Sequence, residues 1–299
     1  MKEYLIGVGG VGGFYGGLLA ESGADITLVS RGESYEAIQK EGLILNRSDG
    51  AHLIYPKMIE NISEITDPDL LILAVKSYSL ESVSRELQSV VRPETTVITL
   101  QNGLDNDLTV SKYLDCEVLP GLVLVASTKT AANVITQKGT QKRLVFGPRD
   151  GRITPKMQEI EKIFKDAGID AKLTEKIENK LWKKFLFVVS FSSATVAGRC
   201  PIGEALSQPE FLKVYIEVLR EAIEVRQSEG IVFETDIFET TLKGARDFDP
   251  SAKSSLLVDL ENGRQTEVEA LQGVVLRLAE KHEVSVPATR EIYRRITSR

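Results

Sequence analysis

A glycine-rich turn close to the N-terminus carries the clearest chemical signal in this sequence. The segment Gly7-Val8-Gly9-Gly10-Val11-Gly12 has the spacing Gly-x-Gly-x-x-Gly, after an apolar run that predicts a strand and before a stretch that predicts a helix. In that context the glycines permit a tight turn, close approach of the backbone to a pyrophosphate, and close packing of helix on strand. The helix N-terminus presents free N–H groups to the phosphates. We therefore predict that residues 7–12 bind a nicotinamide dinucleotide, in preference to a glycine-rich turn without a ligand.

The residues after the next predicted strand indicate which dinucleotide is bound. Domains that prefer NAD carry an acidic residue about 20 residues beyond the glycines, where it bonds the ribose 2′-hydroxyl. Here the strand at residues 26–29 is followed by Ser30-Arg31-Gly32, without a carboxylate. A guanidinium can form two parallel hydrogen bonds to a 2′-phosphate. Arg31 therefore predicts NADP(H) rather than NAD(H); the alternative is an arginine that is merely solvated at the surface.

Two polar residues follow later predicted strands. Lys76 comes after the run Leu70–Val75, and Asn102 comes after Thr96–Leu100 and before Gly103. Open α/β sheets bind ligands at the carboxyl ends of their parallel strands. Both side chains are thus candidates for the cofactor site, although a lysine in this position can also serve only as a surface cap.

The elements that must position these residues follow a recognisable order. Up to about residue 150, short apolar runs alternate with helical stretches, which predicts βαβ units in a doubly wound parallel sheet. Lys138-Gly139-Thr140, between Ala132–Gln137 and Arg143–Phe146, predicts a hairpin added to that sheet. From about Thr174 the apolar residues recur with a period of 3.6, which predicts helices. We expect an α/β fold with a Rossmann domain at residues 1–172 and an all-helical domain at residues 173–299.

Composition excludes several other classes of protein. The 299 residues are 42% hydrophobic and 27% charged, as in ordinary globular proteins, and the net charge of -6 provides no basic field for nucleic acid. The two cysteines, Cys116 and Cys200, indicate neither a disulfide framework nor a zinc site, so we expect no metal. No apolar run approaches the roughly 20 residues of a membrane span, and no secretory signal pattern is present. We expect a cytoplasmic protein that does not bind membranes.

Several further segments, taken with the glycine turn, resemble the ketopantoate reductase family. The resemblance extends over essentially the whole chain in order and spacing. It implies an N-terminal Rossmann domain, a helical C-terminal domain, and NADPH-dependent reduction of 2-dehydropantoate to pantoate, a step towards coenzyme A. The segments are Ala74-Val75-Lys76, Leu100-Gln101-Asn102-Gly103, Leu181-Trp182-Lys183-Lys184, Ser254-Ser255, Thr266-Glu267 and Val286-Pro287-Ala288-Thr289.

The resemblance also implies roles for individual residues. Lys184 matches the general acid of the family, and an ammonium with an ordinary pKa of about 10.4 is protonated at neutral pH. Lys183 and Lys180 are nearby alternatives, but Lys183 points about 100° away around the helix. Lys76 and Asn102 match residues at the cofactor, and Asn102 also touches the substrate. Ser255 matches a substrate contact and Glu267 a cofactor contact; each can alternatively be only a helix cap.

Three positions depart from the family pattern and leave the substrate open. Val188 and Ser192 stand where the family has two asparagines that bond the substrate, and Ile202 stands at a third. Valine offers no hydrogen bond, whereas Ser192 keeps one hydroxyl for the substrate. Each lost partner costs on the order of 1–3 kcal/mol if nothing replaces it. The alternatives are a reductase of another branched 2-oxo acid with a plainer aliphatic tail, or a catalytically silent NADPH-binding sensor.

The expected partners are therefore small molecules. We expect NADP(H) and a 2-oxo acid substrate, with no nucleic acid. The apolar faces of the helical half are compatible with a homodimer, although no stoichiometry follows from the sequence.

Overall fold

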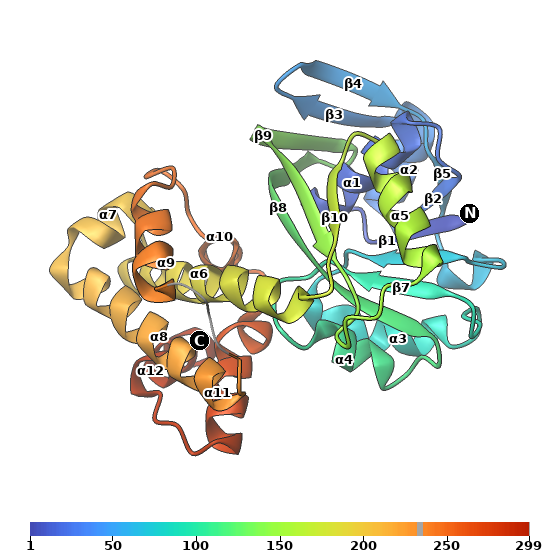
Figure 1. Ribbon diagram of the computed structural model, residues 1–299. Coiled ribbons are helices and arrows are strands. Elements are labelled where there is room, and N and C mark those ends of the chain that lie inside the picture. Colours follow the sequence, from blue (N-terminus) through green and yellow to red (C-terminus); the bar gives the residue numbers. More distant parts are fainter. Residues whose placement is uncertain (232–235, 299) are drawn as a thin grey trace. The chain divides into compact units, whose positions relative to one another are not determined.

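Short strands alternating with helices build the first part of the chain, as the sequence predicts. The computed structural model describes residues 1–231 and 236–298 and contains two units (Figure 1). The first unit comprises Met1–Gln101 and Asn106–Ile177, and the second comprises Asn102–Asp105 and Glu178–Arg299. This division falls after residue 177, whereas the sequence-based domain boundary after residue 172 stays a prediction.

The first unit is built on a mixed sheet in which the strand order is β4-β3-β9-β8-β7-β6-β1-β2-β5, with β10 beside β9. Strands β8, β7, β6, β1, β2 and β5 pair in parallel, and this confirms the predicted α/β class. The strands are β1 Glu3–Ile6, β2 Ile26–Val29, β3 Leu43–Arg47, β4 Gly50–Ile54, β5 Lys57–Ile59, β6 Leu70–Leu73, β7 Thr96–Thr99, β8 Glu117–Ala131, β9 Val134–Phe146 and β10 Asp170–Leu173.

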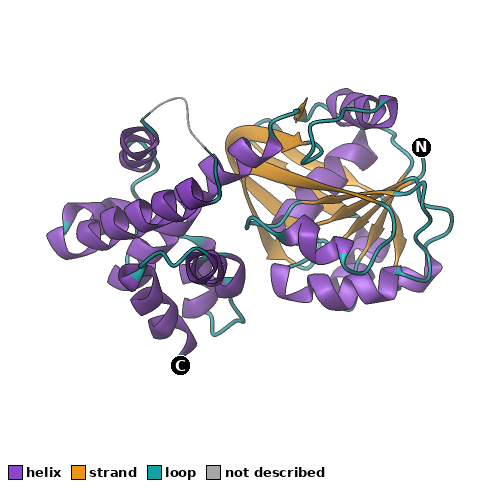
Figure 2. Cartoon of the chain, turned by 60° about the horizontal axis from the view of Figure 1, so that its bottom comes forward, coloured by secondary structure: helices purple, strands orange, loops and turns teal. Residues whose placement is uncertain are grey.

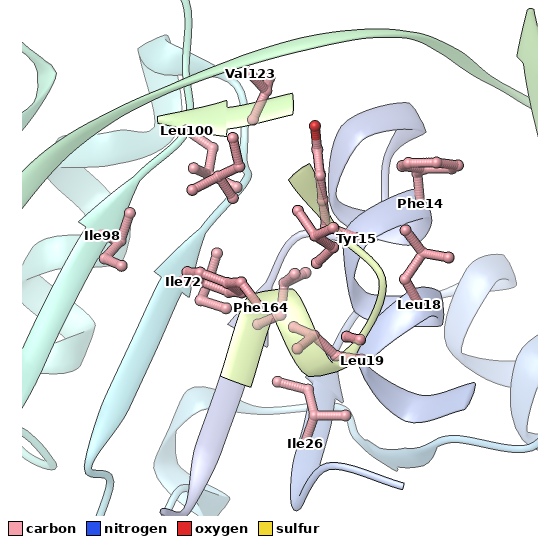
Figure 3. Close-up of a cluster of buried hydrophobic side chains, with 14 of the residues drawn as sticks. Phe14, Tyr15, Leu18, Leu19, Ile26, Ile72, Ile98, Leu100, Val123 and Phe164 are labelled. Carbon is pink, nitrogen blue, oxygen red and sulfur yellow. The ribbon is translucent and has the colours of Figure 1, made fainter. Parts of the chain in front are cut away.

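Helices cover both faces of the parallel strands (Figure 2). Alternate residues of a strand enter two different apolar clusters: Leu5 and Ile72 lie in one, Tyr4 and Leu71 in the other. Figure 3 shows the first cluster, in which side chains of α1 and α5 pack on Ile72. Because a strand buried on both faces must be apolar at every position, the continuous runs in the sequence are explained. The helices are α1 Gly10–Glu21, α2 Glu33–Glu41, α3 Leu80–Leu87, α4 Asn106–Ser111 and α5 Pro155–Asp166, with short 3₁₀ turns η1 Ile62–Glu64 and η2 Ser77–Ser79.

The predicted hairpin turn at Lys138-Gly139-Thr140 is wrong. These residues lie inside β9, and the hairpin joins β8 to β9 through residues 132–133. The register shifts from Leu124 opposite Arg143 to Ala126 opposite Lys138, so additional residues of β9 bulge out near Gly139, where φ is +73°. The glycine signal thus marks an irregularity within a strand rather than a chain reversal.

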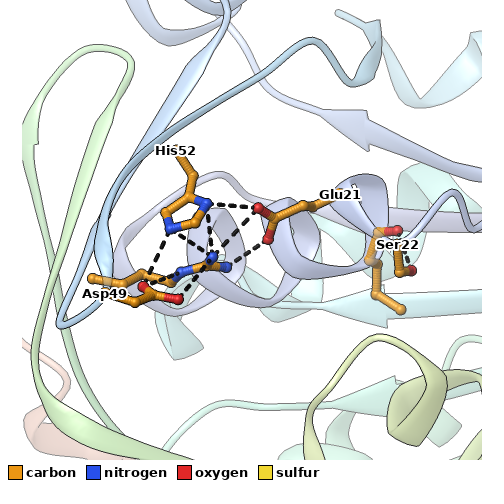
Figure 4. Close-up of polar contacts among 6 residues, drawn as sticks. Glu21, Ser22, Asp49 and His52 are labelled. Atoms are coloured by element: carbon orange, nitrogen blue, oxygen red, sulfur yellow. Dashed lines mark hydrogen bonds and ion pairs between the residues drawn. The ribbon is translucent and has the colours of Figure 1, made fainter.

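The antiparallel pair β3–β4 carries a group of charged side chains against the end of α1 (Figure 4). Glu21 accepts hydrogen bonds from Arg47 at 2.5 Å, and His52 lies 2.9 Å from the same carboxylate. Asp49 contacts both Arg47 and His52. This arrangement places His52 in a structural ion-pair group.

The second unit is helical, which confirms the predicted all-helical C-terminal region. Its longest helix is α6, and its last helix begins at Pro287, where the buried carboxylate of Glu221 accepts hydrogen bonds from the backbone N–H groups of Ala288 and Thr289 at 2.7 and 2.8 Å. The helices are α6 Ile177–Gly198, α7 Ile202–Ser207, α8 Pro209–Ser228, α9 Ile237–Arg246, α10 Ser255–Glu261, α11 Gln272–Lys281 and α12 Pro287–Thr297, with the 3₁₀ turn η3 Val268–Ala270.

Candidate active site

The glycine turn joins β1 to α1 in a conformation that requires glycine at its two ends. Gly7 has φ of +101°, a left-handed value that other residues rarely adopt, and its N–H donates to the carbonyl of Val29 at 3.0 Å. A Cβ on Gly12 would lie 1.9 Å from the carbonyl oxygen of Gly7. Helix α1 therefore sits directly on the turn, as the dinucleotide motif demands.

The middle of the turn fits a phosphate group. A Cβ on Gly9 would meet no atom within 4 Å, so the space above this residue is open. Gly9 is also the N-cap of α1, and no side chain caps that end of the helix. Val8 is buried, whereas Gly10 and Val11 are half-buried at the start of the helix. Backbone N–H groups around an open approach are the donor set that a pyrophosphate needs.

Lys76 lies beside this turn because its neighbour Val75 packs against Gly7. A Cβ on Gly7 would be 2.8 Å from the backbone nitrogen of Val75. Lys76 is half-buried at the N-terminal end of η2. The predicted cofactor residues of the first unit, apart from Arg31, are thus brought together at the carboxyl ends of β1 and β6.

Gln101 is a positioning residue that sequence reasoning missed, although it stands within the quoted motif. Its buried side-chain amide donates to the carbonyl oxygens of Leu73 and Val75, each at 2.9 Å. These bonds tie the end of β7 to the segment that leads into Lys76. The sequence offered one signal for this role. Gln101 directly follows an apolar strand, and a side-chain amide that is buried there must find hydrogen-bond partners.

Arg31 is exposed at the carboxyl end of β2, where we expected the 2′-phosphate. Its guanidinium forms an ion pair with Glu86 of α3 at 2.5 Å, and Glu60 accepts a hydrogen bond of 3.4 Å from the N–H of Gly32. The side chains of Arg31 and Glu86 are both accessible to water, and ion pairs in such positions are weak. The ion pair therefore leaves Arg31 able to turn towards a phosphate.

The second unit brings Lys184 and Glu267 into electrostatic range of each other. Lys184 is half-buried on α6, whereas Lys180 and Lys183 are exposed. Glu267 lies at the N-terminal end of η3 and is half-buried. Trp182 anchors this turn of α6 by packing edge-on against Phe185, with ring centroids 5.7 Å apart. Burial thus separates Lys184 from the two neighbouring lysines.

Burial lowers the pKa of Lys184 to about 8, and the negative charge of Glu267 partly opposes this decrease. This corrects the expectation of an ordinary lysine. An ammonium with a pKa near neutrality is still mostly protonated at pH 7, and it transfers its proton more readily than one near 10. A lysine with this pKa is able to donate a proton at neutral pH.

Replacing Glu267 with glutamine should lower the pKa of Lys184 further, because the charge that favours the ammonium is lost. If Lys184 donates the proton in a reduction, the activity of the wild type is full below about pH 8 and falls above it. In Glu267→Gln this fall should begin roughly one pH unit lower. The measurement is the pH profile of kcat/KM. The matched control is Glu269→Gln, an exposed carboxylate on η3; an unchanged profile in Glu267→Gln would contradict the coupling.

The remaining predicted residues of the second unit occupy different environments. Ser254, rather than Ser255, caps α10, since its Oγ accepts the N–H of Leu257 at 3.1 Å, and this leaves the exposed Ser255 outside the cap. Asn102 is half-buried in a loop whose Asp105 pairs with Arg277 of α11 at 3.0 Å.

Two of the three departures from the family pattern are buried. Ser192 is 2% exposed, and its hydroxyl donates to the carbonyl of Val189 and accepts a hydrogen bond from Gln272 at 3.2 Å. Ile202 is fully buried at the start of α7. Val188 is half-buried, one turn after Lys184. Of these three positions, Val188 is the one that the structure leaves open to a ligand.

Within residues 1–231 and 236–298, no group of three or more histidine, cysteine or acidic side chains is arranged to hold a metal ion. In the same part of the chain, no helix is both long enough and apolar enough to cross a membrane.

Comparison with family models decides the affiliation. The model described as "Ketopantoate reductase PanE/ApbA" matches residues 4–151, and its C-terminal counterpart matches residues 176–299. The chain belongs to the ketopantoate reductase family. It is thus an oxidoreductase of that family, as the motifs predicted.

Relatives of the ketopantoate reductase family differ in what is known of them. The chain is 28% identical over 294 residues to an uncharacterized oxidoreductase, YkpB, of Bacillus subtilis, covering 98% of this chain and 97% of that protein. It is also 28% identical to a 2-dehydropantoate 2-reductase of Pyrococcus horikoshii, covering 96% and 93% of the two chains. These names leave the substrate of the present chain open.

Solved structures show the same fold. A family ketopantoate reductase from Ralstonia eutropha superposes with a TM-score of 0.92 at 25% identity, covering 99% of this chain and 97% of that one. A D-mandelate dehydrogenase crystallised with NADH and anilino(oxo)acetate superposes with a TM-score of 0.90 at 20% identity, covering 100% and 98%. The second likeness concerns the fold alone.

Proposed function

We propose that this protein is an NADPH-dependent reductase that converts a 2-oxo acid to the 2-hydroxy acid, with 2-dehydropantoate and its product pantoate, a precursor of coenzyme A, as the reference pair. The observation that carries the proposal is Lys184, a half-buried lysine with a lowered pKa beside Glu267. The open glycine turn and the family membership support the same reaction class. Val188 favours a second candidate, another branched 2-oxo acid, because it cannot bond a substrate hydroxyl.

The residues of the chain have distinct tasks in this reaction. When bound, NADPH supplies the hydride that adds to C2 of the acid. The N–H groups around Gly9 hold the pyrophosphate, and Lys76 and Asn102 orient the reactants. Lys184 donates a proton from Nζ to the carbonyl oxygen as negative charge develops there, and it regains a proton from solvent afterwards. Glu267 favours the ammonium form, and Ser255 offers a hydroxyl to the substrate.

The test of this proposal is a set of turnover assays in which 2-dehydropantoate and simpler branched 2-oxo acids are each supplied with NADPH and with NADH. We expect NADPH to be oxidised with at least one acid, and more efficiently than NADH. Arg31→Ala should weaken NADPH binding about tenfold and leave NADH binding unchanged, because only NADPH carries the 2′-phosphate.

The matched control for Arg31 is Arg85→Ala, another exposed arginine paired with a carboxylate of α3, Glu81. Binding is measured by the fluorescence of the reduced cofactors. Equal affinities for the two cofactors in the wild type would contradict the role of Arg31. An absence of turnover with every acid would favour a silent NADPH-binding sensor.

We also propose that the second unit forms a homodimer interface.

A further inference from the structure

Three phenylalanine rings of the second unit pack against one another, and the reaction scheme above does not use them. Phe187 and Phe191 lie on α6 with ring centroids 5.4 Å apart. Phe248 follows α9, and its ring lies 5.5 Å from each of the other two. We call these three residues the aromatic trio.

Two members of the aromatic trio, Phe187 and Phe191, lie on the face of α6 that carries Lys184. Phe187 and Phe191 are three and seven residues after Lys184, spacings that place side chains on one face of a helix. Val188, four residues after Lys184, continues the same face. One turn of helix spans about 5.4 Å. The apolar surface therefore begins within one helical turn of the proposed proton donor.

Among the residues that the structure describes, the outer ring of the trio is only partly covered. Phe191 is 6% exposed and forms the base, whereas Phe248 is 44% exposed. The exposed face of Phe248 is therefore available for packing against another aromatic ring. Phe248 also stands seven residues before Ser255, the proposed substrate contact, in the connection between α9 and α10.

This surface lacks side chains that could form hydrogen bonds with a hydroxyl group of the substrate. Val188 replaces an amide, and the hydroxyl of Ser192 is buried and already bonded to Gln272. A substrate hydroxyl placed against Val188 and the trio would lose its hydrogen bonds to water without replacement. An aromatic ring in the same place would instead gain apolar contact and ring-to-ring packing.

We propose that the acceptor of this reductase is a 2-oxo acid with an aromatic side chain, whose ring packs on Phe187, Phe191 and Phe248 while its C2 carbonyl faces Lys184. This inference rests on the proposed function and narrows its substrate class. Phe248 acts as a specificity-determining residue: it contacts the side chain of the acid and takes no part in the transfer of hydride or proton.

The experiment compares kcat/KM for phenylglyoxylate, 2-oxobutanoate and 2-dehydropantoate with NADPH. For the wild type we expect phenylglyoxylate to be preferred over 2-oxobutanoate by at least about tenfold. Phe248→Ala should reduce that preference by about tenfold, mainly through a higher KM for phenylglyoxylate, and leave 2-oxobutanoate nearly unchanged. Val188→Asn should shift the preference towards 2-dehydropantoate. The control is Tyr55→Ala, which removes a 70% exposed aromatic ring from the first unit.

The outcomes separate the inference from the function on which it rests. A lack of NADPH oxidation with all three acids would overturn the proposed function. Oxidation with 2-dehydropantoate or 2-oxobutanoate but not with phenylglyoxylate would overturn only the aromatic substrate. An unchanged preference in Phe248→Ala, together with a change from dimer to monomer by light scattering, would instead make the aromatic trio a subunit interface. Because the readout is a ratio between substrates, a general loss of folded protein does not imitate the expected result.

Discussion

Replacing Lys184 with methionine should reduce kcat for the 2-oxo acid by roughly 10² to 10⁴-fold while leaving the dissociation constant for NADPH nearly unchanged. Methionine preserves the length and apolar packing of the side chain but cannot donate a proton. The alkoxide that develops as the hydride adds would then have to be protonated by water. The measurement combines steady-state turnover with titration of NADPH fluorescence.

The matched control for this substitution is Lys183→Met, one residue away on the same helix. Lys183 is exposed, so its loss should change kcat less than about twofold, as for surface substitutions generally. Comparable losses in both variants would indicate a role for the positive charge of this helix as a whole. Unchanged turnover in Lys184→Met would show that the proton comes from another group.

Replacing Gly9 with alanine should weaken binding of NADPH and NADH alike by about a hundredfold, while the free energy of unfolding changes little. The new Cβ would enter open space, so nothing in the protein opposes it, and φ of -89° suits alanine. That open space is where the motif brings a pyrophosphate against backbone N–H groups. Loss of two charge-assisted hydrogen bonds of about 1.5 kcal/mol each corresponds to the expected change.

Gly12→Ala provides the contrasting case. Its Cβ would meet the carbonyl oxygen of Gly7 at 1.9 Å, so α1 must move away from the turn. We expect a loss of about 1–3 kcal/mol or more in the free energy of unfolding, as for overpacked cores. Chemical denaturation and cofactor titration of both variants separate the two effects. If Gly9→Ala binds NADPH as the wild type does, the phosphates do not lie over the turn.

Much of the first unit could be predicted because its signals are local. Gly7 and Gly12 are fixed by the geometry of one turn, and strands such as Leu70–Leu73 are apolar at every position because both faces are covered. The pair β3–β4 was missed because each strand has only five residues, without regular alternation of apolar and polar side chains, and the outer strand β4 is mostly exposed. The turn near Gly139 was misplaced because a bulge and a hairpin both favour glycine with positive φ.

The residues of the candidate site could be named from the sequence, but their burial, pKa values and hydrogen-bond partners could not be predicted. Lys184 was identified by its motif, yet its lowered pKa depends on side chains that bury it and on Glu267, which is distant in the sequence. Ser192 was expected to meet the substrate, but packing against Gln272 buries it. The hydrogen bond from the Gln101 side chain to Leu73 forms only because β6 and β7 lie side by side. Burial and pairing arise from tertiary contacts that spacing does not encode.

The half-buried ammonium on α6 also has a thermodynamic consequence for the folded protein. The pKa of Lys184 is about 8 in the folded chain and near its ordinary value of 10.5 in the unfolded chain. Between these values the unfolded state binds more protons, so the free energy of unfolding rises with pH across this window. Below about pH 8 the folded state carries the full cost of holding the charge away from water. The side chain proposed to supply the proton is therefore one that weakens the fold at neutral pH, and reactivity at this position is in direct opposition to stability.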